Sequence, residues 1–105
     1  MPNVELLFFP DCPNVSAARD QLRRAFAFAG VSPTWSEIDV TSDAAPAHAR
    51  GHGSPTILVA GEDVSGETRR EGCSCRVYLE SEDRRVPPLE AIVAALRAAD
   101  AGERA

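Results

Sequence analysis

Lysine is absent from this sequence, and all of its basic residues are arginine. This absence excludes catalysis by a lysine Schiff base or by the lysine of a phosphate-binding loop. A membrane-spanning helix needs about 20 consecutive apolar residues, and no apolar run approaches that length. The first residues also lack the basic region and long apolar stretch of a secretory signal. We therefore expect a cytoplasmic protein with no membrane contact.

Positive charge is scarce as well. The formal net charge is −5, and the arginines gather only in short pairs such as Arg23-Arg24, Arg69-Arg70 and Arg84-Arg85. Nucleic-acid binders normally present a basic surface, because neutralisation of phosphates supplies much of their affinity. We therefore expect no nucleic-acid partner.

Cysteine occurs three times, as Cys12, Cys73 and Cys75. An odd number of cysteines, without a secretion signal, argues against a framework of structural disulfides. Reactive or metal-binding thiols are the better interpretation. The length of 105 residues suits one domain with one modest core. We expect a single domain over residues 1–105, with a frayed tail from about residue 100.

The first half of the chain alternates between strand and helix patterns. Val4–Phe9 is an apolar run typical of a buried strand. Pro13 fits the first turn of a helix, where its missing N–H costs nothing. One apolar helical face then follows at spacings of three and four residues, formed by Val15, Ala18, Leu22, Phe26 and Ala29. Gly30 is predicted to end this helix.

The remaining elements are predicted from shorter patterns. They are a strand over Thr34–Val40, a short helix over Ala44–Arg50 capped by Ser42 or Asp43, a strand over Thr56–Ala60, a polar loop over Glu62–Gly72, a strand over Arg76–Glu80, and a helix over Leu89–Ala99. Gly102 and the charged end are expected to fray. The order β-α-β-α-β-β-α predicts an α/β fold with a mixed four-stranded sheet flanked by helices.

The segment Phe8-Phe9-Pro10-Asp11-Cys12-Pro13-Asn14 places a cysteine between a buried strand and a helix. The positive end of the helix dipole favours the thiolate of Cys12, which is the form that attacks disulfides and binds metals. The neighbouring Asp11 opposes this effect through like charge. The competing interpretation is a buried, inert cysteine that packs as a small hydrophobe.

A second motif, Gly53-Ser54-Pro55-Thr56, leads into the third strand. With Cys12 and the order of elements, it makes nearly the whole chain resemble the thioredoxin and glutaredoxin superfamily. The resemblance implies a single thioredoxin-like domain in which Cys12 is the nucleophile. It also implies that Pro55 follows a cis peptide bond and that the backbone of Ser54 faces the substrate. We expect Ser54, Pro55 and Pro13 to contact the substrate.

The chain departs from the C-x-x-C motif of that superfamily, because Val15 replaces the second cysteine. Exchange must then proceed through Cys12 alone or with a resolving thiol from elsewhere. More narrowly, the chain is similar to short bacterial thioredoxin-fold proteins with a C-P-N start and a late S-C-R-x-Y segment. Some of these carry an alkylmercury-lyase label, but the winged-helix region of the larger lyases has no counterpart here.

The candidate resolving thiols are Cys75 and, as a second choice, Cys73. A C-x-C pair also suits soft metal ions or a strained disulfide. In the simple topology, Cys75 begins the fourth strand at the far end of the sheet, about 16 Å from the Cys12 end. A disulfide needs Cα atoms within about 7 Å. The long loop Glu62–Gly72 would bring the pair back toward Cys12, so both arrangements stay open.

The two histidines carry weaker signals. His52 precedes Pro55 by three residues and is within reach of the Cys12 end, whereas His48 falls on the short, exposed helix. Solvated side chains are the expected state of both.

Three functions follow from these residues. The leading one is thiol–disulfide exchange, with a protein or a low-molecular-weight thiol or disulfide as partner and no cofactor. The second is binding of a mercuric or cuprous ion by Cys12, Cys73 and Cys75, extended to an organomercurial-lyase-like activity. The third is a redox-inactive thioredoxin-like module that makes protein contacts.

Overall fold

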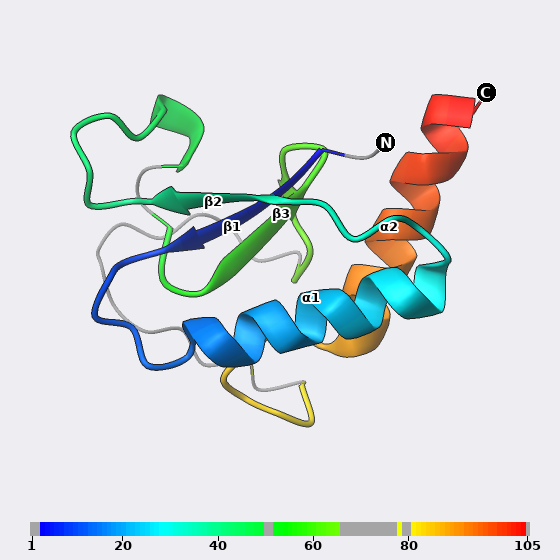
Figure 1. The fold of residues 1–105 in the computed structure, drawn as a ribbon, viewed down its shortest axis with the longest axis horizontal. Coiled ribbons are helices and arrows are strands. Elements are labelled where there is room, and N and C mark those ends of the chain that lie inside the picture. Colours follow the sequence, from blue (N-terminus) through cyan, green and yellow to red (C-terminus); the bar gives the residue numbers. More distant parts are fainter. Residues whose placement is uncertain (1–2, 50–51, 66–77, 79–80, 105) are drawn as a thin grey trace.

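Four strands form one mixed sheet at the centre of the molecule (Figure 1). β1 (Val4–Phe8) pairs in parallel with β2 (Ser36–Asp39) and antiparallel with β3 (Thr56–Val59), and β4 (Glu62–Asp63) pairs antiparallel with β3. The strand order is β2-β1-β3-β4. This computed structural model describes residues 3–49, 52–65, 78 and 81–104. The predicted α/β fold with a mixed four-stranded sheet is confirmed.

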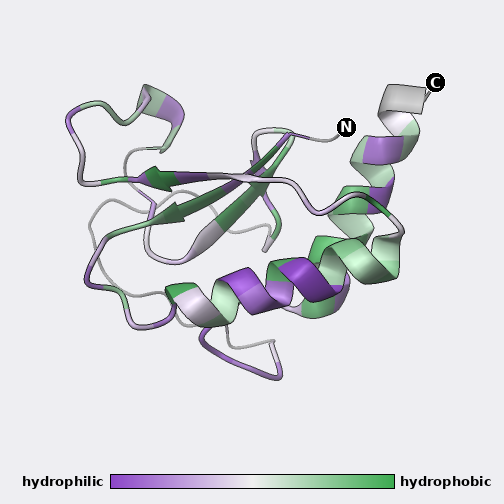
Figure 2. Cartoon of the chain, in the orientation of Figure 1, coloured by the Kyte–Doolittle hydropathy of each residue, from purple (hydrophilic) through white to green (hydrophobic). Residues whose placement is uncertain are grey.

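Two helices cover one face of the sheet. α1 (Val15–Ala29) and α2 (Leu89–Arg104) pack together against β1 and β3. Figure 2 shows hydrophilic and hydrophobic residues alternating along α1, as a helix with one buried face requires. α1 ends at Gly30 as predicted, because the φ of 70° at this residue lies in the left-handed region that glycine adopts without strain. The core residues that are at most 1% exposed on this face are Leu6, Ala18, Leu22, Ala25, Phe26, Ile57, Val86, Ile92 and Leu96.

A smaller apolar cluster covers the opposite face. It joins Leu7, Val40 and Leu58 to Ala49, which belongs to the 3-10 helix η1 (Ala47–Ala49). Both central strands are therefore covered on two sides, which explains why β1 and β3 are nearly continuous apolar runs in the sequence.

The predicted short helix over Ala44–Arg50 is present only as the single 3-10 turn η1, and Arg50 lies outside the described residues. Ser42 uses both of its oxygens to turn the chain where that helix was expected to begin. Its Oγ accepts the N–H of Ala44 at 3.1 Å, and its carbonyl accepts the N–H of Ala45 at 3.1 Å. Such local turns compete with helix formation. Pro46 follows directly and has no N–H to donate to a longer helix.

Glu5 and His48 connect β1 to η1 on this second face. Glu5 is only 8% exposed, and the Nε2 atom of His48 lies 3.1 Å from each of its carboxylate oxygens. The side chain of His48 is 51% exposed, as expected for a solvated histidine, but its ring also contacts Glu5. A buried carboxylate needs a polar partner, and His48 supplies one from a segment distant in sequence.

The predicted loop over Glu62–Gly72 is also corrected, because it begins as strand β4. Ala60 and Gly61 form a two-residue turn between β3 and β4, with φ values of 52° and 83°. Two positive φ values in succession are typical of the tight turns that join antiparallel strands. Alanine is uncommon at such a position, since its Cβ opposes positive φ, and the turn therefore had no obvious sequence signal.

The C-terminal end of the chain differs from its prediction too. α2 continues to Arg104, whereas a stop at Ala99 and a frayed tail were expected. The high helix propensity of Ala98 and Ala101 offsets the unfavourable propensity of Gly102. The predicted strand over Arg76–Glu80 lies outside the described residues except for Tyr78, which belongs to no strand.

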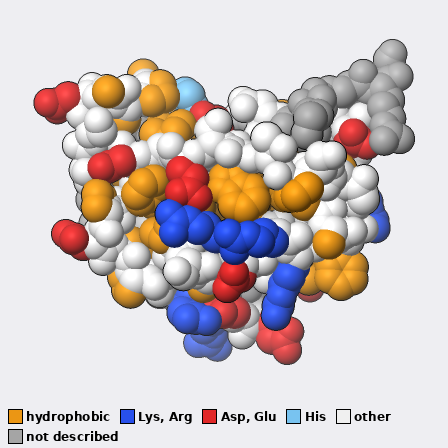
Figure 3. All heavy atoms as spheres, viewed as in Figure 1, with side chains coloured by type: hydrophobic (Ala, Val, Ile, Leu, Met, Phe, Trp, Pro, Cys, Tyr) orange, Lys and Arg blue, Asp and Glu red, His pale blue; other side chains and the backbone are white. Residues whose placement is uncertain are grey.

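Several arginines on the surface around α1 form ion pairs with acidic side chains. Arg19 on α1 donates from Nε and Nη2 to the two carboxylate oxygens of Glu37, at 2.9 and 2.8 Å. These hydrogen bonds from Arg19 lower the pKa of Glu37. Arg23 pairs with Asp20 at 2.9 Å, and Figure 3 shows basic side chains beside acidic ones on this face. Each exposed pair contributes at most about 1 kcal/mol. Because basic and acidic side chains are interspersed on this face, they do not form a basic patch.

Ala60 offers a direct test of the β3–β4 turn. Replacing Ala60 by Asn should raise the free energy of unfolding by about 1 kcal/mol, because asparagine tolerates positive φ. Ala60→Val is the matched control and should lower stability, since a β-branched residue is strained there. Both values come from urea unfolding. Equal stabilities for the two variants would contradict the positive φ at this residue.

The contact between Glu5 and His48 predicts energetic coupling between these residues. His48→Ala should lower stability by about 1–2 kcal/mol, because the buried Glu5 carboxylate loses its partner. Adding Glu5→Leu should restore part of that loss, since the carboxylate is then gone. A double-mutant cycle measured by thermal unfolding gives the coupling. Strictly additive effects would show that the contact carries no energy.

Candidate functional site

The register of β1 and β3 defines one end of the sheet. Leu7 lies opposite Thr56 in this antiparallel pair, so the end of β1 and the start of β3 meet at the same edge. The loop that carries Cys12 follows β1, and Ser54 and Pro55 directly precede β3. The fold therefore brings the two sequence motifs to one end of the sheet from positions more than forty residues apart.

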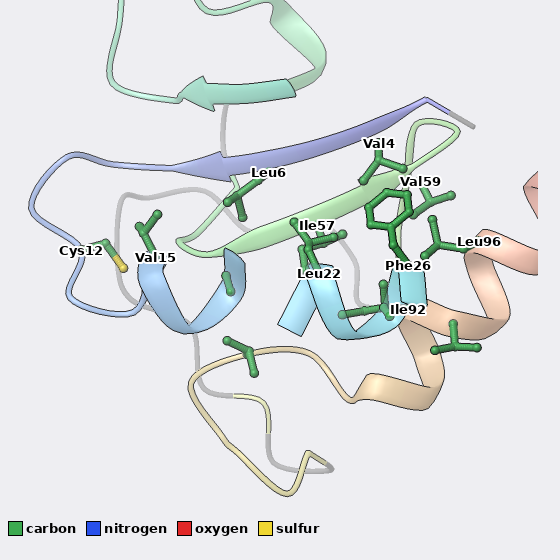
Figure 4. Packing of buried hydrophobic residues seen from close by; sticks show 14 residues of the cluster. Val4, Leu6, Cys12, Val15, Leu22, Phe26, Ile57, Val59, Ile92 and Leu96 are labelled. Carbon is green, nitrogen blue, oxygen red and sulfur yellow. The ribbon is translucent and has the colours of Figure 1, made fainter. Parts of the chain in front are cut away.

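Cys12 occupies a tight turn between β1 and α1. Its backbone N–H donates to the carbonyl of Phe9 at 3.0 Å. Figure 4 shows the side chain pointing from this loop toward the first turn of α1, where Val15 lies. Cys12 is 7% exposed and belongs to the main apolar core. The thiol is thus more deeply set than the expected position at an open helix end.

The positive end of the α1 dipole has neither a side-chain cap from Asn14 nor an acidic residue in the first turn to offset it. The helix begins at Val15 rather than at Pro13, and Asn14 occupies the N-cap position without a side-chain hydrogen bond. No acidic residue lies in the first turn. The first N–H groups of a helix have no partner within it, and together with the dipole they favour a negative charge nearby. Pro13 is exposed just before the cap.

The segment before β3 is held by hydroxyl groups. The Ser54–Pro55 peptide bond is cis, which confirms that expectation. The hydroxyl of Thr56 donates to the carbonyl of Gly53 at 2.7 Å, and the hydroxyl of Tyr78 donates to the carbonyl of Pro55. Thr56 and Tyr78 are almost completely buried. These contacts fix the backbone on both sides of Ser54.

Ser54 differs from its neighbours because its hydroxyl is unsatisfied. It is 0% exposed, and its Oγ has no hydrogen-bond partner in the described part of the chain. A buried hydroxyl without a partner costs about 1–3 kcal/mol, and most buried polar groups are satisfied. Ser54 is thus a fully enclosed polar group whose hydroxyl the described contacts do not satisfy.

Of the other predicted site residues, the structure describes some and not others. Cys73 and Cys75 lie outside the described residues, so their proposed pairing with Cys12 stays a prediction. His52 is described and is half-buried. Val15, at the position of the missing second cysteine, is buried in the core, so this position contributes packing and no thiol.

Sequence reasoning missed the two residues that hold the Pro55 segment. Tyr78 belongs to the predicted strand and to the S-C-R-x-Y segment, and Thr56 belongs to the second motif, but neither is predicted to hold this backbone. A single tyrosine in the chain, within an otherwise alternating segment, was the available signal. Its partner is a backbone carbonyl more than twenty residues away, which no local pattern reveals.

The described residues contain no group of three or more His, Cys, Asp or Glu side chains arranged to hold a metal ion; Cys73 and Cys75 are not among them. In the same part of the chain, no helix has both the length and the apolar character needed to cross a bilayer. The site and the sheet together define an α/β domain with a buried cysteine beside an uncapped helix end.

Comparison with known proteins adds no family to this description. No protein-family model, curated protein or solved structure matches the chain.

Two hydroxyl deletions should have opposite effects on stability. Tyr78→Phe should lower the free energy of unfolding by about 1–2 kcal/mol, because the buried carbonyl of Pro55 loses its donor. Ser54→Ala should leave stability unchanged or raise it, because it removes a hydroxyl that has no partner. Chemical unfolding of both variants measures the contrast. A marked loss of stability in Ser54→Ala would show that this hydroxyl is satisfied in solution.

Proposed function

We propose that this chain is a thioredoxin-like protein that exchanges disulfides through Cys12. The observation that carries the proposal is the meeting of two features at one end of the sheet. One is a cysteine beside the uncapped N-terminus of α1, and the other is the buried, unsatisfied hydroxyl of Ser54 in a rigid segment. The strand order β2-β1-β3-β4, with α1 and α2 on one face, further supports this assignment.

The chemistry begins with the thiolate of Cys12. It attacks one sulfur of a partner disulfide, so that a bond forms from Cys12 to that sulfur and the old sulfur–sulfur bond breaks. The second partner sulfur leaves as a thiolate and takes up a proton. In this proposal the partner is held against the Ser54–Pro55 segment, which lies at the same end of the sheet as Cys12.

A second thiol completes the cycle. We propose Cys75, or Cys73 as the alternative, as the group that attacks the Cys12 sulfur and releases the first partner as a thiolate. The product is an internal disulfide, which low-molecular-weight thiols of a cytoplasmic environment reduce. Without a resolving thiol in this chain, an external thiol attacks the mixed disulfide instead, and the protein acts through one cysteine.

The burial of Cys12 sets a requirement on this mechanism. Because Cys12 is only 7% exposed, a partner disulfide has little direct access to it, and we propose that the Phe9–Asn14 loop moves during exchange. The same burial is the observation that favours the second candidate function, a redox-inactive module that makes protein contacts. The two candidates differ in the reactivity of one thiol.

Mixed-disulfide formation with an aromatic disulfide reagent tests the proposal. A variant with Cys73→Ser and Cys75→Ser keeps Cys12 as its one thiol and should form a stoichiometric adduct, detected by intact mass. Cys12→Ser should lose the fast phase of the reaction and the ability to reduce a protein disulfide. Cys75→Ser alone should slow turnover but keep adduct formation at Cys12.

Two controls keep the test interpretable. Circular dichroism checks that each serine variant is folded, and Ser54→Ala should bind a disulfide substrate more weakly while its fold is intact. If the variant with Cys12 alone reacts only when unfolded by denaturant, the exchange function is wrong and the redox-inactive module takes its place. Tight uptake of mercuric ion that requires Cys12 and Cys75 together would instead support the metal-binding alternative.

A further inference from the structure

A surface groove lies where the C-terminal end of α1 meets α2, away from Cys12. Its volume is about 370 Å³, and its lining is formed by Phe28, Leu89, Glu90, Val93, Ala94 and Arg97. Phe28 is 65% exposed and is the large hydrophobic side chain most open to solvent in the described chain. A single exposed hydrophobic residue is ordinary, but Phe28 lies beside a groove that Leu89, Val93 and Ala94 also line.

Arg97 fixes the geometry of this surface. Its Nη2 atom donates to the backbone carbonyl of Phe28 at 3.0 Å, which satisfies one carbonyl at the end of α1. The contact joins α2 to the end of α1 and keeps the guanidinium at the edge of the groove. Its remaining N–H donors are available to a carboxylate.

The charges along the groove have a specific order. Glu90 and Arg97 are seven residues apart, so they lie two turns apart on the same side of α2. Midway between them lie the exposed Ala94 and Val93, which lines the groove but is largely buried in the core. Glu90 is exposed, and the described residues provide no ion-pair partner for its carboxylate. One end of the surface is therefore negative, the other is positive, and the middle is apolar.

We propose that this surface binds a second copy of the chain, with the two α2 helices antiparallel. A two-fold axis between Val93 and Ala94 places Glu90 opposite Arg97 of the other copy, and Arg97 opposite its Glu90. The same axis passes beside the exposed Ala94 of each copy, where the small side chain permits close approach of the two helices. Isologous dimers require such a self-complementary surface.

The charge order favours this occupant over others. An acidic or basic peptide would satisfy only one of the two charged ends and would leave the other facing a like charge. A reversed copy of the same helix satisfies both ends at once, because each copy carries the same pair of residues. Phe28 of each copy then loses its exposure against the flank of the partner α2, which supplies apolar burial.

The dimer leaves the Cys12 end of the molecule open. Phe28 lies at the C-terminal end of α1 and Cys12 precedes its N-terminal end, about 20 Å away along the helix. The inference therefore does not depend on the proposed exchange activity. Each copy in the dimer presents its own Cys12 site.

Charge reversal with sedimentation analysis tests the dimer. The wild-type chain should sediment as a dimer. Glu90→Arg and Arg97→Glu should each raise the dissociation constant by roughly tenfold or more, because like charges then face each other twice per dimer. An equimolar mixture of the two variants should form a heterodimer, since one copy presents two arginines and the other two glutamates. The double variant should recover the homodimer.

Further variants separate the interface from folding. Phe28→Ser should weaken the dimer without unfolding the chain, because the side chain is largely exposed. Glu82→Arg reverses an exposed charge outside the groove and should sediment as the wild type does. A wild-type monomer at all concentrations would overturn the proposal. So would single reversals that stay dimeric, or a mixture of the two reversed chains that fails to associate.

Discussion

The antiparallel register of β1 against β3 is the constraint on which the rest of the structure depends. It places Leu7 opposite Thr56, and with that one pairing both faces of the central strands are assigned. Leu6 and Ile57 then face α1 and α2, whereas Leu7 and Leu58 face η1. A shift by one residue would exchange these faces and expose the apolar side chains of the core. The candidate site is a consequence of the same pairing.

At the end of the sheet where β3 begins, some buried polar groups have hydrogen-bond partners and one has none among the described residues. The carbonyls of Gly53 and Pro55 each accept a hydroxyl, from Thr56 and Tyr78, while the buried hydroxyl of Ser54 has no partner in the described chain. The proposed recognition of a partner rests on this rigid backbone around one unsatisfied group. The burial of Cys12 limits access to the thiol in the proposed exchange.

The opposite end of α1 has a different character. There the helix ends at Gly30, Arg97 binds the carbonyl of Phe28, and an aromatic side chain is exposed beside α2. A single helix of fifteen residues thus separates a buried thiol from an apolar surface with ordered charges. The proposed dimer and the proposed exchange at Cys12 are therefore independent, because neither surface uses residues of the other.

Elements with local signals were predictable from the order of residues alone. The apolar runs gave β1 and β3, the spacing of three and four residues gave α1, and Gly30 marked its end, because backbone sterics and one buried face act within a few residues. Only the tertiary structure decided the contacts between distant segments. Four features depend on groups that packing brings together. They are the contact of Glu5 with His48, the hydrogen bond from Tyr78 to Pro55, the burial of Cys12 and the β4 strand after Ala60. Their energies arise from burial and long-range hydrogen bonds, which no local pattern encodes.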